Sequence, residues 1–349
     1  MMKKTLIAAA ALLAVAGTAN AQVAIYGLMD VSVGQGLLDN ITAANGQKFH
    51  LSCATGLTPG EKDVNFHSGG DNCSSEGNST TRIGFKGGYE VAPGMKANFK
   101  LETGGIESSG KVNNDGSFFN RQAWFGFSSN YGEVRFGRQD SVAFQMMNGY
   151  DFNGASNGVS ALTFTGVAPY APGRQSRSLQ YISPGFSGFT AQAGLQLKDT
   201  TANPNAKDVI ALSGKFEQGP ISAGVSYQSK AASTGKDFSS IAGSYDFKVV
   251  KVMASYTQGG EIANGGTGSG YGLGITAPVA GFNIGAIYGT NDDDLAKIKA
   301  YELFINKEIF KNTYAYGEYG DWKGDLSAFG PGTGDSKAKG FAIGVIYVF

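Results

Sequence analysis

The stretch Lys339–Phe349, KGFAIGVIYVF, decides the fold. One parity of this stretch carries large apolar and aromatic side chains: Phe341, Ile343, Val345, Tyr347 and Phe349. Successive side chains of a strand point to opposite faces, so this strand has one large, aromatic-rich face. Aromatic rings settle at a membrane boundary, and such a face is therefore typical of a lipid-facing strand. A soluble sheet could also end in an apolar strand, and the rest of the chain must separate the two.

The composition indicates extensive β-structure and little acid–base chemistry. The chain has 349 residues, with 28 basic and 28 acidic side chains, 53 glycines and only 2 histidines. A balanced charge argues against a nucleic-acid partner, because nucleic-acid binding needs a basic excess. Aromatic residues make up 12 % of the chain, whereas a disordered glycine-rich chain lacks them. We therefore expect a folded β-rich protein that binds no nucleic acid.

The first 21 residues predict a signal peptide. Lys3 and Lys4 form a charged start, residues 6–17 form an apolar core, and Ala19–Ala21 is a small-residue cleavage site. The mature domain is then expected to cover residues 22–349. No later stretch approaches the roughly 18 apolar residues of a membrane helix. An exported chain of this kind is soluble, surface-attached or a β-barrel.

From Gln22 onward, apolar and polar residues alternate in short segments. Ile83 and Phe85 occupy one parity, for example, while Arg82 and Lys86 occupy the other. A β-sandwich strand would hide its apolar face in the core and show its charged face to solvent. A membrane barrel would show the apolar face to lipid and line a wet lumen with the charged face. Alternation alone leaves both readings open.

The lengths of the connections favour the membrane barrel. Short turns, such as the one at Pro93, alternate along the whole chain with longer polar loops, a habit of outer-membrane barrels. The longest loops are the first, about residues 34–79, and the third, about Asp140–Arg174. Counting the segments gives about 16 strands, and a closed barrel of that size leaves an aqueous channel. We predict an all-β, single-domain transmembrane antiparallel barrel.

Several motifs follow one another along the mature chain and carry a specific resemblance. They are IYGLMD at 25–30, TRIGFKG at 81–87, NRQAWFGF at 120–127, GEVRFGRQ at 132–139, YISP at 181–184 and YVF at 347–349. In these motifs the chain resembles the general porins of Gram-negative outer membranes, particularly the β-proteobacterial trimeric type. The long first loop is not part of that family's pattern.

The resemblance implies a passive, water-filled diffusion channel for ions and small hydrophilic solutes. It also implies a homotrimer, surrounded by outer-membrane lipid and lipopolysaccharide, that needs no cofactor. In that family the third external loop folds into the barrel and narrows it. That loop here is about Asp140–Arg174.

Basic side chains are expected to line the lumen. Strand parity places Arg82, Lys86 and Arg135 there, and the resemblance adds Arg121 and Arg174 as constriction arginines. For Arg121 parity is ambiguous, because Ala123, Phe125 and Phe127 share its phase. A β-bulge near Ala123 would turn Arg121 inward, and without one it would face the trimer interface.

Clustered guanidinium groups across a narrow aqueous gap concentrate anions and repel cations, so we expect a mild anion preference. The nearest acids that would offset them are Asp140 and Asp151. Gln180 stands where the family usually has a basic residue, which weakens the positive wall. A second reading stays open, in which the cations pair with Glu102, Glu133 and Asp30 and produce no selectivity.

The two cysteines, Cys53 and Cys73, lie in the first loop, 20 residues apart. In an oxidising compartment they predict one disulfide. His50, His67 and Asp71 lie nearby, but their spacing fits no established ligand pattern, and we expect no metal site.

Three other functions compete with a general channel. An enzyme is disfavoured because both histidines sit in one loop, away from any strand that could position an acid or base. A sugar-specific channel would stack its solute on aromatic rings, and Tyr314 and Tyr316 share one lumen-facing parity. A secreted β-rich adhesin would stay in solution without detergent.

Overall fold

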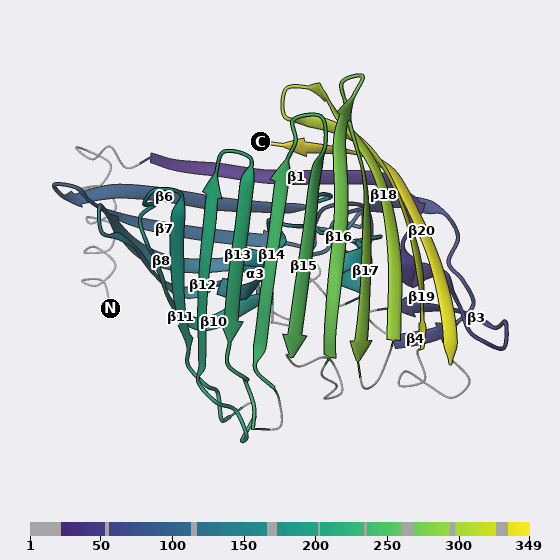
Figure 1. Cartoon of the computed structure of the whole chain (residues 1–349), viewed down its shortest axis with the longest axis horizontal. Coiled ribbons are helices and arrows are strands. Elements are labelled where there is room, and N and C mark those ends of the chain that lie inside the picture. Colours follow the sequence, from purple (N-terminus) through teal and green to yellow (C-terminus); the bar gives the residue numbers. More distant parts are fainter. Residues whose placement is uncertain are drawn as a thin grey trace, which may run out of the picture.

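The chain forms a closed antiparallel barrel of 16 long strands (Figure 1). The computed structural model describes residues 22–52, 56–112, 117–165, 173–201, 203–233, 236–259, 268–293, 297–325 and 334–349. The strand number and the antiparallel closure predicted from the sequence are confirmed. Residues 1–21 lie outside the described residues, so the signal peptide stays a prediction.

Sixteen strands build the wall. They are β1 (Gln22–Gln35), β6 (Arg82–Ala92), β7 (Met95–Gly104), β8 (Gln122–Ser129), β9 (Gly132–Asp140), β10 (Arg174–Ile182), β11 (Phe189–Gln196), β12 (Val209–Gln218), β13 (Ile221–Gln228), β14 (Phe238–Asp246), β15 (Lys251–Gly259), β16 (Gly268–Val279), β17 (Phe282–Asp293), β18 (Lys297–Phe310), β19 (Thr313–Asp325) and β20 (Asp335–Val348). The first loop adds β2 (Ile41–Thr42), β3 (Lys48–Ser52), β4 (Gly56–Pro59), β5 (Asn65–Ser68) and the short helices η1 (Leu37–Asp39) and α2 (Asp71–Ser74). The third loop contains α3 (Val142–Asn148) and α4 (Ala161–Phe164).

The barrel closes where β20 pairs with β1. Gly27 N donates to Phe349 O at 2.9 Å, and Phe349 N donates to Gly27 O at 3.1 Å. The rings of Tyr347 and Phe349 stack with centroids 5.9 Å apart. Ile343 is 68 % exposed and its neighbour Ala342 only 3 %. The two-faced strand predicted at 339–349 is therefore confirmed, with its large face directed outward.

The outer surface is apolar and the inner surface polar. Ile25, Ile241 and Leu303 are each more than half exposed, whereas Asp30 and Glu302 on the opposite parity are fully buried. A sandwich would bury the apolar parity instead, so this distribution excludes that reading. Among the described residues, no helix is long and apolar enough to cross a membrane.

Connections of two lengths separate the two ends of the barrel. The short turns of β12–β19 gather at the top of Figure 1, and the longer connections lie at the opposite end. In outer-membrane barrels the short turns face the periplasm and the long loops face the exterior. This orientation places the first and third loops at the external end.

The third loop lies inside the barrel, against the inner face of β11–β19. Helix α3 packs on β11–β14, and α4 packs on β17–β19. Gly224 of β13 makes room for the first contact, because a Cβ there would lie 2.7 Å from the sulfur of Met146. Met146, Tyr150 and Leu162 are each at most 3 % exposed. The loop therefore covers the lumen side of β11–β19 and also contacts β10, where Gln145 of α3 donates to Gln180.

The first loop fastens the middle of the third loop. Leu37 N donates to Gly158 O at 2.9 Å, and Gly158 N donates to Gly77 O at 2.9 Å. An apolar cluster that includes Leu37, Leu162 and Trp322 joins both loops to β19. The two loops thus behave as one packed unit at the external end of the lumen.

Candidate functional site

A basic wall lines the lumen along β6–β10. Its strands are neighbours in the sheet, and their inward parity carries most of the charge. The basic side chains are Arg82 and Lys86 on β6, Lys96 and Lys100 on β7, Arg121 before β8, Arg135 on β9 and Arg174 on β10. Wall carboxylates are fewer: Glu90, Glu102, Glu133 and Asp140. All predicted lumen cations therefore come together on one side of the channel.

Arg121 reaches the lumen without a β-bulge. It precedes the first residue of β8, and the β7–β8 register runs without a shift from Glu102 and Gln122 onward. Its Nε lies 2.5 Å from Oε1 of the inward-facing Glu102. The expectation that Arg121 would face outward unless a bulge lay near Ala123 was wrong. Strand alternation does not fix a side chain that lies before the strand.

Glu102 holds the centre of the basic wall. This carboxylate is 3 % exposed and accepts a hydrogen bond from the Tyr26 hydroxyl at 2.7 Å. Lys100 Nζ lies 3.3 Å from Glu102 Oε2, the oxygen that also accepts from Tyr26. Gly84 lets the Tyr26 ring lie against β6, since a Cβ there would meet Tyr26 Cζ at 2.6 Å. One buried carboxylate thus organises two cations and a phenol.

Three arginines converge around this centre. Arg82 donates to Thr80 O at 3.0 Å, and its charge interacts with those of Arg121 and Glu102. Arg174 Nε lies 3.2 Å from Asp140 Oδ1, and its charge also interacts with that of Arg121. Two carboxylates therefore serve three guanidinium groups, which leaves positive charge in excess.

Aromatic faces position several of the remaining cations. The Arg135 guanidinium lies 4.5 Å from the ring centroid of Trp124 and pairs with Glu133 at 2.7 Å. Lys86 Nζ lies 5.0 Å from the centroid of Tyr26. Such contacts hold a cation without neutralising its charge. Glu133 offsets the charge of Arg135, whereas Lys86 has no ion-pair partner among the described residues and keeps its charge.

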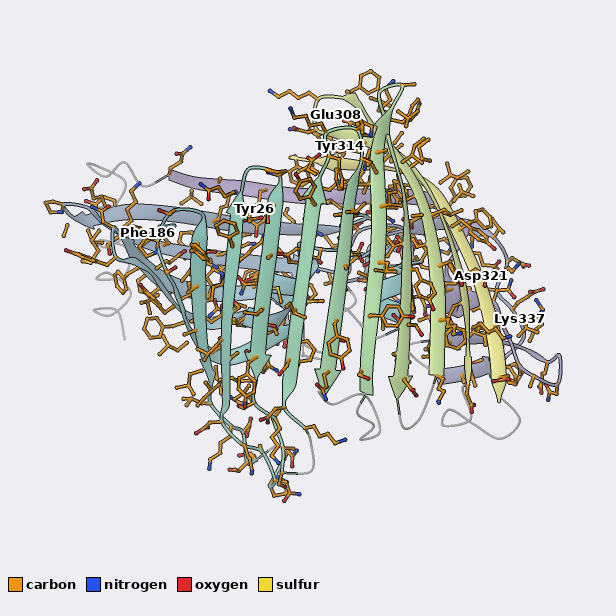
Figure 2. All side chains as sticks on the ribbon, in the orientation of Figure 1. Tyr26, Phe186, Glu308, Tyr314, Asp321 and Lys337 are labelled. Atoms are coloured by element: carbon orange, nitrogen blue, oxygen red, sulfur yellow. The ribbon has the colours of Figure 1, made fainter. Side chains whose placement is uncertain are left out.

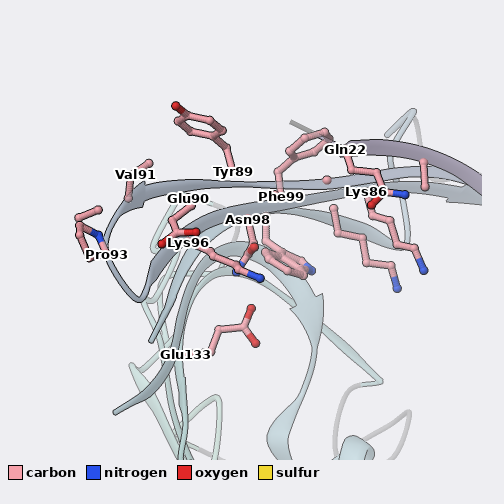
Figure 3. A pocket seen from close by; sticks show the side chains of 16 residues that line it. Gln22, Lys86, Tyr89, Glu90, Val91, Pro93, Lys96, Asn98, Phe99 and Glu133 are labelled. Carbon is pink, nitrogen blue, oxygen red and sulfur yellow. The ribbon is translucent and has the colours of Figure 1, made fainter. Parts of the chain in front are cut away.

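A cavity of about 990 Å³ continues the basic wall toward the short turns. In Figure 3, Lys86, Lys96 and Glu133 point into this space, while Tyr89 and Val91 point away from it. Charged inner side chains and apolar outer ones on the same strands are what a water-filled lumen in a membrane requires.

The wall opposite carries carboxylates that the third loop covers. Glu302 of β18 is 0 % exposed and accepts from Asn153 Nδ2 at 2.6 Å and from Ala161 N at 2.8 Å. Glu318 of β19 accepts from Asn153 Nδ2 at 2.9 Å and from Ser156 Oγ at 2.8 Å. We did not single out either residue from the sequence. Their inward parity on apolar strands was the available signal.

Asp30 of β1 completes this covered group. Its Oδ2 accepts from Ser79 N at 2.6 Å and from Asn78 N at 2.8 Å, and Tyr316 donates to Oδ1 at 2.8 Å. Asp30 therefore pairs with loop amides rather than with lumen cations. Tyr316 is 6 % exposed, and its ring is not free to stack against a passing sugar.

Asp151 lies within the third loop rather than on a water-lined surface. It is 6 % exposed, and its carboxylate accepts from Ser160 Oγ at 2.9 Å and from Asn153 N at 3.0 Å. Burial raises the pKa of this carboxyl above its ordinary value. The placement differs from the prediction, because the chain folds back on Asp151 before it can face the arginines.

Asp140 and Gln180 join the basic wall to the third loop. Asp140 lines an inner cavity of about 320 Å³ beside Gln145 of α3. Gln180 is fully buried; it donates to Asp140 O at 2.8 Å and accepts from Gln145 Nε2 at 3.0 Å. A neutral amide can donate and accept in this way, and a lysine or arginine could only donate. Gln180 is therefore a loop anchor.

The first loop contains an ion-pair cluster. Asp39, His67 and Glu76 bring side-chain atoms within 4.8 Å of one another, and Lys62 Nζ lies 2.8 Å from Asp39 Oδ1. Burial, followed by the contact with Asp39, raises the pKa of Glu76 to about 9. The Lys62 ammonium supplies the positive charge that the buried Asp39 carboxylate needs.

Of the two cysteines predicted to form a disulfide, the structure describes Cys73. Cys73 is disulfide-bonded. Cys53 lies outside the described residues, so its pairing with Cys73 stays a prediction. His50 takes no part in the cluster around His67; its Nδ1 lies 3.0 Å from Gly60 O.

Comparison with known proteins identifies the family. The Gram-negative porin family matches residues 8–326. The chain is a Gram-negative porin. It is 25 % identical to an outer membrane porin protein of Bordetella pertussis, across 99 % of this chain and 90 % of the relative. It is 29 % identical to outer membrane porin protein 32 of Delftia acidovorans, across 90 % and 88 %.

A solved structure shares the fold of this porin. The anion-selective porin from Comamonas acidovorans superposes with a TM-score of 0.72 at 23 % identity, covering 95 % of this chain and 100 % of that one. The resemblance read from the sequence is confirmed. This porin is an outer-membrane channel, and its family consists of passive channels rather than enzymes.

Proposed function

We propose that this porin is a diffusion channel with an anion preference set by the basic wall of β6–β10. The observation that carries the proposal is the unequal exposure of charge across the lumen. Lumen-side cations outnumber the carboxylates on β6–β10, and the opposite carboxylates Asp30, Glu302 and Glu318 are at most 6 % exposed beneath the loops.

Charge at a narrow aqueous passage acts on ions at short range. The Debye length is about 10 Å at 0.1 M salt, so ions that pass within a few ångströms of Arg82, Arg121 and Arg174 feel them weakly screened. Carboxylates beneath a packed loop are hydrogen-bonded and lie farther from the passing ion. The local potential is therefore positive although the whole chain has a formal charge of +0.

The comparisons support this proposal. The Comamonas acidovorans structure with the same fold is titled anion-selective. A Vibrio cholerae OmpT structure, titled a trimer form, superposes with a TM-score of 0.62 at 16 % identity. We propose that this porin is also a homotrimer, surrounded by lipid and lipopolysaccharide. Anions and small hydrophilic solutes pass through its channels. The mature protein begins at Gln22, after residues 1–21 are removed.

Planar-bilayer recording of the detergent-purified porin across a salt gradient tests the proposal. We expect current steps in groups of three. We also expect a reversal potential whose sign shows that chloride permeates more readily than the cation. The variant Arg82→Gln/Arg121→Gln/Arg174→Gln should move that potential toward zero. Lys198→Gln/Lys207→Gln/Lys236→Gln removes the same charge from exposed loop positions and should leave the potential nearly unchanged. A cation preference in the unmodified porin would contradict the proposal.

A further inference from the structure

The first loop brings one histidine and two carboxyl groups into a single cluster. Asp39 of η1, His67 of β5 and Glu76, which follows α2, each contribute one possible ligand atom, and these atoms lie within 4.8 Å of one another. Asp39 and Glu76 are each 1 % exposed. We call the three side chains the loop triad. They come from separate segments, which is why spacing along the sequence predicted no metal site.

Two carboxyl groups flank the His67 ring. Asp71 Oδ2 lies 4.0 Å from Nδ1, and Glu76 Oε2 lies 3.8 Å from Nε2. Asp71 is itself held in place, because it accepts from the amides of Ser68 at 2.8 Å and Ser108 at 2.9 Å. A metal-binding histidine has this arrangement, in which a fixed carboxylate faces one ring nitrogen and the other nitrogen faces the metal.

The Nε2 atom of His67 is buried and has no hydrogen-bond partner among the described residues. The Glu76 oxygen at 3.8 Å is too far away to serve as one. A buried polar atom without a partner is rare, because it loses its contact with water and gains nothing in return. A cation within the loop triad would supply the partner that Nε2 lacks and would offset the charge of the two carboxylates.

The donor atoms of the loop triad suit Zn²⁺. Imidazole nitrogen combined with carboxylate oxygen is a donor set that Zn²⁺ accepts, whereas Mg²⁺ and Ca²⁺ prefer sites made of oxygen alone. Ligand atoms around a tetrahedral zinc lie roughly 3.4 Å apart, so the loop triad needs to contract by about 1 Å. Cys73 is disulfide-bonded, and its sulfur therefore does not compete for the ion as a thiolate.

Lys62 is the competitor of a bound cation. Its Nζ lies 2.8 Å from Asp39 Oδ1, and its side chain is 31 % exposed. The ammonium group and Zn²⁺ repel each other and need the same carboxylate. Because the lysine side chain already reaches solvent, it can turn outward when the ion enters. Removal of Lys62 should therefore strengthen the binding of Zn²⁺.

We propose that the loop triad binds one Zn²⁺ ion and thereby strengthens the junction between the first and third loops. Asp39 follows Leu37 by two residues, and Leu37 N donates to Gly158 O at 2.9 Å. Glu76 directly precedes Gly77, whose carbonyl accepts from Gly158 N at 2.9 Å. An ion that joins Asp39 to Glu76 would therefore hold both contacts of Gly158 together.

The site lies at the external end of the barrel, apart from the basic wall of β6–β10. The first loop pairs with β20 through β2, where Thr42 lies opposite Lys337. Figure 2 shows Lys337 near the end with the long connections. No member of the loop triad belongs to β6–β10, so the proposal stands independently of the anion preference.

The test is isothermal titration calorimetry of the full-length, detergent-purified porin with ZnCl₂, after washing with a chelator and without a histidine tag. His67→Gln removes the nitrogen ligand. His50→Gln removes the only other histidine of the chain, in the same loop, and is the matched control. Glu76→Gln removes a carboxylate ligand while keeping a side chain that can donate and accept hydrogen bonds. The heat-dependent gel shift of a folded barrel would show that each variant folds.

We expect one Zn²⁺ per chain. His67→Gln and Glu76→Gln should each weaken binding by more than about 100-fold, since loss of an outer-shell partner alone costs about 10–100-fold. His50→Gln should bind as the unmodified porin does, and Lys62→Met should bind more tightly. Hydrogen exchange at the Gly158 amide should slow when Zn²⁺ is added to the unmodified porin and stay unchanged in His67→Gln.

Three results would overturn the proposal. The first is an unmodified porin that binds no Zn²⁺. The second is equal binding by His67→Gln and His50→Gln, which would place the ion elsewhere on the chain. The third is binding of Mg²⁺ as tight as that of Zn²⁺, because attraction to acidic groups would then account for it without the imidazole.

Discussion

The two sides of the lumen carry charge in opposite states. On β6–β10, the side chains of Arg82 and Arg174 are partly exposed, although α3 reaches β10 at Gln180. On β18, β19 and β1, the carboxylates Glu302, Glu318 and Asp30 are occupied by loop amides and hydroxyls. The proposed anion preference of this porin therefore depends on which charges a loop covers. A count of charges along the sequence, which is balanced, does not contain that information.

Covering these carboxylates has a structural use. A buried carboxyl group is costly unless hydrogen bonds satisfy it. Glu302 and Glu318 accept hydrogen bonds from Asn153, Ser156 and Ala161 of the third loop. If the loop moved out of the lumen, both carboxyl groups would lose these hydrogen bonds. The same hydrogen bonds therefore anchor the third loop and cover the carboxyl groups on this side of the lumen.

The largest effect is expected from Glu302→Ala, which breaks the covered side. Asn153 Nδ2 and Ala161 N would each lose an acceptor, and leaving a buried donor without its acceptor costs about 1–3 kcal/mol. We expect faster hydrogen exchange at Ala161 and protease cleavage within the third loop. Glu308→Ala, on the exposed end of the same strand, is the control. Equal exchange at Ala161 in both variants would show that Glu302 does not anchor the loop.

A second, smaller effect is expected from Glu102→Gln, which sharpens the basic side. The change removes the charge that Arg121 and Lys100 share while keeping the size of the side chain. The ratio of chloride to potassium permeability should rise about twofold, as the local potential becomes more positive. A fall in that ratio, measured from reversal potentials, would mean that Glu102 only keeps the arginines in place.

Asp140→Asn and Asp151→Asn form a matched pair that separates wall from loop. Asp140 pairs with Arg174 at 3.2 Å, so its neutralisation should raise the anion preference measurably. Asp151 is buried, and burial raises the pKa of its carboxyl group. Asp151→Asn should therefore shift the reversal potential by less than Asp140→Asn does. If Asp151→Asn had the larger effect, Asp151 would act on the lumen as the sequence suggested.

The smallest effect concerns pH and the first loop. The pKa of Glu76 is raised from 4.5 to about 9, so the folded loop binds more protons than the unfolded loop between these values. Its stability should therefore fall as pH rises through that window, by at most about 1.4 kcal/mol for each pH unit. Hydrogen exchange near Glu76 should speed up from pH 7 to pH 9 beyond the intrinsic rate. Glu76→Gln should remove that excess; an excess that persisted would assign it to Asp39, Lys62 or His67.

Strand parity predicted most of the fold and part of the site. It placed Arg82 and Lys86 on the inner face because both lie inside a regular strand whose outward residues are apolar. It failed for Arg121 because alternation applies only within the strand, and Arg121 lies one residue before β8. A side chain there is positioned by its ion pair with Glu102, which joins two segments 19 residues apart.

The path of the third loop could not be predicted from local patterns. Asp151 seemed available to the arginines because nothing in its neighbourhood shows that Ser160 folds back to it. The roles of Glu302 and Glu318 depend on contacts made across more than 140 residues of sequence. Gln180 likewise appeared as a missing positive charge, and its amide proved to hold α3 to β10.

The most direct test of the account is the reversal potential of a porin whose residues 144–165 are replaced by a short Gly-Ser linker. The removed segment contains one charged residue, Asp151, so counting charges predicts a stronger anion preference. Our account predicts the opposite, because Glu302 and Glu318 would become open to the lumen: conductance should rise and the anion preference should weaken or reverse. An anion preference that stayed the same or grew, in a barrel shown to be folded, would contradict it.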